Sequence, residues 1–122
     1  MINTIYQWLF PHTITDKYNK SVNRLLDYCI ALLEKRFLDR DPEKIKASLS
    51  YLSKPEIRNK TATLFRQRNI QKVKGNICEE SGIIYLEIIG VNNSVIPEKT
   101  YCFKFWPCDI CPCVTVHRVY LQ

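Results

Sequence analysis

The chain has 122 residues, of which 46% are hydrophobic and 25% are charged. These proportions are typical of one folded domain and exclude a disordered chain, while only three glycines exclude a collagen-like one. Eighteen Lys and Arg against twelve Asp and Glu give a net charge of +6, which suggests an acidic or phosphate-bearing partner. No apolar run reaches the roughly 20 residues of a membrane-spanning helix, and residues 1–10 lack the basic start of a secretory signal. We therefore expect a single cytoplasmic domain over residues 1–122 that makes no membrane contact.

Three segments follow one another along the chain: residues 1–12, a helical half over 13–69 and a β half over 70–122. In the first, apolar residues spaced three and four apart predict a short helix that Pro11 stops. The helical half carries a long apolar stripe and two proline-marked helix starts, which predict helices over 16–38, 42–52 and from Pro55 onward.

The β half is rich in β-branched and aromatic residues that alternate with polar ones. Four strands are predicted, over residues 70–78, 83–91, 101–106 and 114–121. Helices followed by hairpin-connected strands predict an α+β fold, in which the helices pack on one face of a roughly four-stranded antiparallel sheet.

The order of these elements resembles that of the NTF2-like superfamily of cone-shaped α+β domains. The resemblance covers residues 25–121, and includes the end of the long helix at 34–38 and the turn at 39–42. It also includes the long strand at 83–89. It is a likeness in the order and length of the elements, without a specific motif.

Membership of that superfamily would imply a range of activities, from isomerases and dehydratases to transport and assembly modules. Its enzymes place Asp, His or Tyr in an apolar cavity between the helices and the sheet. Here the resemblance offers Glu87, Tyr101 and His117 as residues of such a cavity. The predicted strands contain no Asp, which departs from the enzymes and favours a non-enzymatic protein, with an enzyme or small-ligand binder as an alternative.

Three cysteines crowd the turn before the last predicted strand. Cys108 and Cys111 form a C-x-x-C pair, Cys113 follows, and Cys102 lies six residues before the pair. Thiolates about 3.7 Å apart can share a tetrahedral zinc ion, so these four are the candidate ligands of a zinc site. A second C-x-x-C is absent. The same thiols also fit two other interpretations: small buried residues in a Pro-containing turn, or a redox pair.

The positive charge is concentrated around the predicted junction between the helical and β halves. Residues 54–74 hold seven basic side chains against one acidic side chain. Five of them are candidates for a binding face: Arg58, Arg66, Arg68, Lys72 and Lys74. Such a face would suit an acidic protein surface or nucleic-acid phosphates, and the alternative is a solvated helix face.

Aromatic residues offer a second candidate surface. Tyr6, Trp8 and Phe10 are concentrated near the N-terminus, where they could dock onto a partner or a second copy, or cover one end of the core. Tyr101, Phe103 and Phe105 alternate along one predicted strand and are expected to form core beneath the helices.

Together these features predict a small non-enzymatic binding or assembly module. We expect it to engage a protein partner through the N-terminal aromatic residues and the basic face over 54–74, with a homodimer as one form of that partnership. A nucleic-acid-binding protein that uses the same basic segment is the alternative. No cofactor is expected unless the cysteine turn holds zinc.

Overall fold

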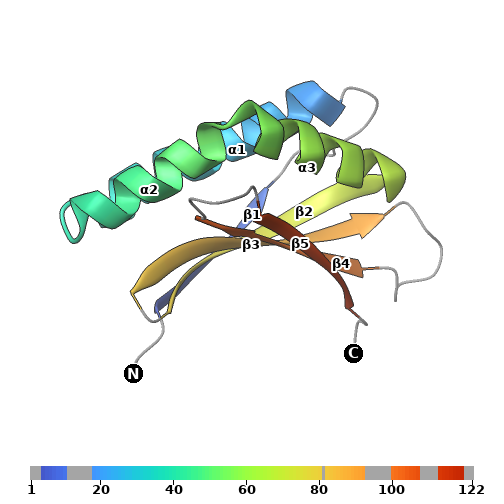
Figure 1. The fold of residues 1–122 in the computed structure, drawn as a ribbon. Coiled ribbons are helices and arrows are strands. Elements are labelled where there is room, and N and C mark those ends of the chain that lie inside the picture. Colours follow the sequence, from blue (N-terminus) through green and yellow to red (C-terminus); the bar gives the residue numbers. More distant parts are fainter. Residues whose placement is uncertain (1–3, 11–17, 81, 93–99, 108–112, 120–122) are drawn as a thin grey trace.

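The computed structural model of the chain describes residues 4–10, 18–80, 82–92, 100–107 and 113–119. Three helices form one layer above a single twisted sheet (Figure 1). The elements in chain order are β1 (Thr4–Phe10), α1 (Tyr18–Phe37), α2 (Pro42–Ser53), α3 (Pro55–Gln67), β2 (Ile70–Glu80), β3 (Ile83–Asn92), β4 (Thr100–Trp106) and β5 (Cys113–Val119). The α+β fold with its antiparallel sheet is therefore confirmed.

The sheet has five strands in the order β1-β2-β3-β4-β5, and every neighbouring pair is antiparallel. The four strands predicted after residue 70 are all present. The fifth, β1, pairs with β2 over its full length, from Thr4 opposite Glu79 to Phe10 opposite Val73.

The short helix predicted over the first residues is wrong, because Thr4–Phe10 is strand β1. Ile5 and Leu9 fit helical spacing, but a segment this short with three aromatic residues at every second position fits a strand as well. The long strand β2 offers an edge with unpaired backbone groups, and pairing with that edge favours the extended conformation.

The three predicted helices are confirmed to within a few residues. Asp41 caps α2 as expected, because its side chain accepts a hydrogen bond of 3.2 Å from the Lys44 backbone N–H. That bond and the Lys44 ammonium, 3.1 Å away, hold the pKa of the Asp41 carboxyl below its usual value. None of the helices in the described ranges is long and apolar enough to cross a membrane.

The core lies between the helix layer and one face of the sheet. Its largest fully buried side chains include Phe37 from α1, Phe65 from α3, and Phe103 and Phe105 from β4. The Phe65 and Phe103 rings pack with their centroids 4.6 Å apart. Gly90 of β3 lies against the Phe103 ring, and a Cβ atom at this position would come within 3.0 Å of that ring.

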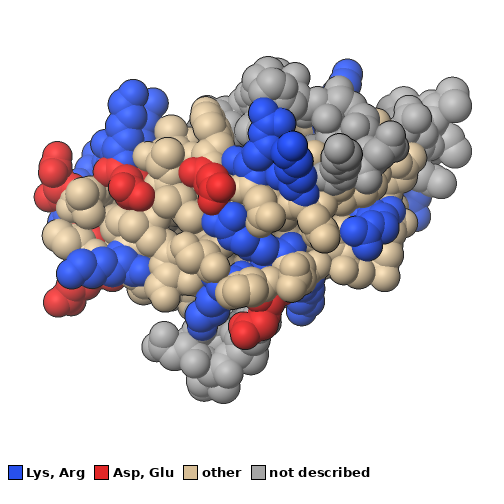
Figure 2. All heavy atoms as spheres, turned by 90° about the horizontal axis from the view of Figure 1, so that it is seen from above, with Lys and Arg blue, Asp and Glu red and all other residues tan. Residues whose placement is uncertain are grey.

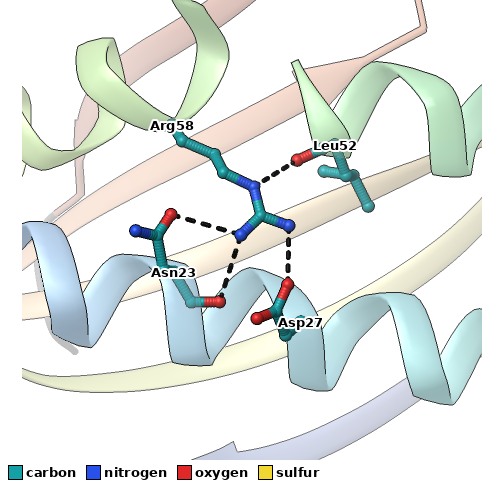
Figure 3. A network of polar contacts seen from close by, with 4 residues as sticks. All are labelled: Asn23, Asp27, Leu52 and Arg58. Carbon is teal, nitrogen blue, oxygen red and sulfur yellow. Dashed lines mark hydrogen bonds and ion pairs between the residues drawn. The ribbon is translucent and has the colours of Figure 1, made fainter. Parts of the chain in front are cut away.

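Arg58 joins the three helices to one another (Figure 3). Its Nε donates to the carbonyl oxygen of Leu52 at 2.9 Å, near the end of α2. Its two terminal nitrogens reach α1, where they donate to the Asn23 side chain at 3.2 Å and to the Asp27 carboxylate at 2.7 Å. A second link joins the ends of the helical half, because the Tyr18 hydroxyl donates to Asn69 at 3.0 Å. Asn69 follows α3 and adopts a positive φ of 49°.

Candidate functional site

The helices cover only one side of the sheet (Figure 1). Side chains alternate between the two sides of a strand, so the pairing registers define a second face, which we call the outer face. Within the described residues no helix packs on it. Its described side chains are Lys72, Lys74, Asn76, Cys78, Ile83, Tyr85, Glu87, Ile89, Val91, Thr100, Cys102, Lys104, Trp106, Thr115, His117 and Val119.

An aromatic pair stands at one end of the outer face. Tyr85 of β3 and Trp106 of β4 stack with ring centroids 5.7 Å apart and an angle of 29° between the rings. Trp106 keeps 45% of its surface exposed, and Ile83, two residues before Tyr85, keeps 49%. Val119, on the edge strand β5, is 36% exposed. The outer face therefore presents large apolar side chains to water.

A polar row crosses the middle of the outer face. Asn76, Glu87, Lys104 and Thr115 lie side by side on β2, β3, β4 and β5, because the registers pair each with the next. The Lys104 ammonium lies 3.6 Å from the Glu87 carboxylate, and both side chains remain partly exposed. Asn76 is only 6% exposed, and its Oδ1 has no hydrogen-bond partner among the side chains that the structure describes.

Cys102 is buried beside this polar row. Burial raises the pKa of its thiol to about 11, and the negative charge of Glu87 adds to the rise. The thiol is therefore protonated at neutral pH and is a poor nucleophile.

The three residues suggested for an enzyme-like cavity do not meet. Tyr101 packs against the core on the helix side of the sheet, where the Arg68 guanidinium lies 5.4 Å from its ring centroid. Glu87 and His117 lie on the outer face. The alternation of side chains along β4 explains the separation, because Tyr101 has the same parity as the core residue Phe103.

The proposed cysteine ligands do not form one group either. In the β4–β5 ladder Cys102 pairs with His117, four residues along from the Trp106–Cys113 pair. At about 3.4 Å per residue, the backbones of Cys102 and Cys113 are roughly 13 Å apart along the strands. This distance is too large for both to bind one zinc ion. Cys108 and Cys111 lie outside the described residues. Within the described part no three His, Cys, Asp or Glu side chains gather as a metal site.

The five basic candidates are divided between two sides of the molecule. Arg58 is engaged with α1 and α2, Arg66 lies 3.5 Å from Asn19 on the helix layer, and Arg68 covers Tyr101. Lys72 and Lys74 belong to the outer face. Figure 2 looks down on the helix layer and shows Lys and Arg in several separate groups with acidic side chains among them. The segment 54–74 therefore does not form one continuous basic face.

The N-terminal aromatic residues are part of the sheet. Tyr6, Trp8 and Phe10 pair through their backbones with Ile77, Gly75 and Val73 of β2. Their side chains lie outside what the structure describes, so their role as a docking surface stays a prediction.

A small apolar hollow opens between the helix layer and the sheet. It encloses about 190 Å³ of space that is continuous with solvent. Leu33, Ser48, Tyr51, Ile84, Phe105 and Pro107 are among its lining residues. Because this space includes open solvent, the hollow falls well short of the roughly 300 Å³ of a site for a small molecule.

The sequence carries only part of the signal for the outer face. Cys102, Lys104 and Trp106 alternate with the core aromatic residues of β4, and Tyr85 and Glu87 alternate with buried residues of β3. This alternation separates a buried set from a mixed set within each strand, but only the strand pairing brings the mixed sets side by side.

No protein-family model, curated protein or solved structure matches the chain. The likeness to NTF2-like domains thus remains one of element order.

Proposed function

We propose that the protein is a non-enzymatic binding module whose outer face docks a protein partner. The observation that carries this proposal is the one-sided packing of the sheet. The helices bury one face, while the opposite face exposes Trp106, Ile83 and Val119 around a polar row. An exposed apolar surface with a polar component is typical of a protein–protein interface.

Trp106 is the expected centre of binding energy on this surface. Tryptophan is enriched among interface residues whose truncation costs more than 2 kcal/mol, because its large ring buries much area with few rotatable bonds. Tyr85 supports the Trp106 ring from one side, so little conformational freedom is left for a partner to remove.

The charge distribution favours a protein over a nucleic acid. The basic residues of segment 54–74 lie on two sides of the molecule, and Lys104 of the outer face is already paired with Glu87. A surface for phosphates needs several unpaired cations on one face, whereas the outer face combines both charge signs with apolar side chains.

Site-specific photo-crosslinking tests this proposal. A benzoylphenylalanine in place of Thr115 reports on the outer face, and one in place of Lys60 of α3 reports on the helix layer; both positions are exposed. We expect a protein crosslink from position 115 that Trp106→Ser reduces at least tenfold, with the circular dichroism spectrum unchanged. A crosslink from position 60 alone, or one at 115 that Trp106→Ser leaves intact, contradicts the proposal.

A further inference from the structure

We propose that the partner is a second copy of this chain, and that two outer faces pack against each other about a twofold axis. This inference rests on the proposed function, because it assumes that the outer face docks a protein, and it adds the identity of that protein. Three properties of the face carry it: its extent, the order of its polar row and the position of its aromatic pair.

The extent of the outer face matches what a stable dimer requires. Five strands spaced about 4.8 Å apart make the face roughly 24 Å wide, and seven paired residues make it roughly 24 Å long. The area in projection is then close to 600 Å², similar to the surface of about 800 Å² per partner in a standard interface. An occupant must therefore cover nearly the whole face, and a second flat sheet can do so.

The polar row is self-complementary in such a pair. A twofold axis in the interface, parallel to the strands and midway between β3 and β4, places β3 of each copy opposite β4 of the other. Glu87 then faces the second copy's Lys104, and the reverse contact repeats it. Because the two side chains are partly exposed at 3.6 Å from each other, both can also reach across the interface.

The same axis extends the polar row across the interface. It sets β2 opposite the second copy's β5, so Asn76 and the second copy's Thr115 lie in the same row. Polar residues therefore face polar residues along this row of the pair.

The neighbouring rows bring apolar side chains together. Tyr85 faces the second copy's Trp106 on one side of the polar row, and Ile89 faces the second copy's Cys102 on the other side. Two twisted sheets pack face to face with their strand directions within about 30° of each other, and an axis parallel to the central strands satisfies this condition. The exposed surface of Trp106 is buried in that arrangement.

Two charge-reversal variants test the arrangement with the full chain. Glu87→Lys carries two positive side chains in the polar row, and Lys104→Glu carries two negative ones. We expect the wild type to sediment at twice the chain mass. Each variant alone should bind itself at least tenfold more weakly, because four like charges meet at the axis. An equimolar mixture in which one variant is labelled with ¹⁵N should recover the dimer, with native mass spectrometry showing one labelled and one unlabelled chain in each pair. Lys60→Glu, on the helix layer, is the matched control and should sediment as the wild type.

Trp106→Ser provides an independent variant if a charge reversal fails to fold. Trp106 keeps 45% of its surface exposed, so the monomer tolerates the change, but its ring faces the second copy's Tyr85 and its loss should weaken the dimer. A wild type that is monomeric at about 1 mM overturns the second copy as partner, and so does a dimer that neither Trp106→Ser nor the mixture of variants affects.

The proposed function fails separately. If the wild type is monomeric but the crosslink from position 115 still depends on Trp106, the outer face docks another protein and only the present inference is wrong. If no crosslink depends on Trp106, both are wrong.

Discussion

Arg58 was predicted from its charge to bind a partner, but in the structure it connects the helices to one another. Its charge places it among the candidates for a partner surface, yet its side chain is only 17% exposed and donates from α3 to groups on α1 and α2. A planar guanidinium with five donors can satisfy a helix-end carbonyl, an amide and a carboxylate at once. The residue therefore stabilises the helix layer, and its contribution belongs to folding.

Replacing Arg58 should destabilise the fold. Arg58→Ala leaves the Leu52 carbonyl and the Asn23 side chain without their donor, so we expect the free energy of unfolding to fall by about 1–3 kcal/mol. Urea denaturation followed by circular dichroism measures the change. Lys60→Ala, an exposed site on the same helix, is the control and should stay within about 0.5 kcal/mol of wild type. Equal stabilities of the two variants would show that the network contributes nothing.

The cap at Asp41 should make stability depend on pH. Its carboxyl has a lowered pKa in the folded protein, so the carboxylate stabilises the fold above the ordinary Asp value near 4, and this stabilisation is lost as the pH falls further. Asp41→Ala should lower the urea midpoint at pH 7 and approach the wild type near pH 2. Asp41→Asn should retain part of the cap. A constant difference between Asp41→Ala and wild type across this range contradicts the assignment.

At the scale of elements, the helices were predictable because their signals are local. Apolar residues every three or four positions, Asp41 before Pro42 and Pro55 at a helix start are all contained in short windows of sequence. Strand β1 was not predictable in this way. Its conformation depends on pairing with β2, which lies some sixty residues away in the chain.

The core side chains of the neighbouring strands leave no room at Gly90. A Cβ atom there would come within 2.9 Å of Ile70 and 3.0 Å of Phe103, so Gly90→Ala forces core side chains to move. We expect a loss of about 1–3 kcal/mol in the free energy of unfolding, measured by thermal or urea denaturation. Val91→Ala is the control variant. Val91 lies on the outer face, so its truncation should lower the free energy of unfolding by less than Gly90→Ala does. A Gly90→Ala protein as stable as wild type would mean that the core can adjust.

For the whole molecule, burial on both sides of the sheet protects two thiols. Cys29 of α1 faces the core and Cys102 lies in the outer face, and burial raises the pKa of both thiols. Neither is ionised at neutral pH in the folded protein.

Alkylation should therefore follow unfolding. At pH 8 we expect iodoacetamide to modify Cys29 and Cys102 at least tenfold more slowly in the folded protein than in 6 M guanidinium, as peptide mass spectrometry can measure. Rapid modification of Cys29 in folded protein would show that the helix layer opens. Rapid modification of Cys102 alone would show that the outer face is more accessible than its burial indicates.

The sequence by itself determined the α+β class, the three helices and the four C-terminal strands, because helical and two-residue periodicities and proline positions act over a few residues. It also separated the core aromatic residues Phe103 and Phe105 from the residues that alternate with them. The tertiary structure decided the rest: the placement of β1, the division of the basic segment between two sides, and the separation of Tyr101 from Glu87. These depend on strand pairing and register, which join residues distant in the chain and set the face on which each side chain lies. The net charge of +6 is thus spread over both sides of the molecule, while the outer face, with its exposed Trp106, emerges only once the strands are paired.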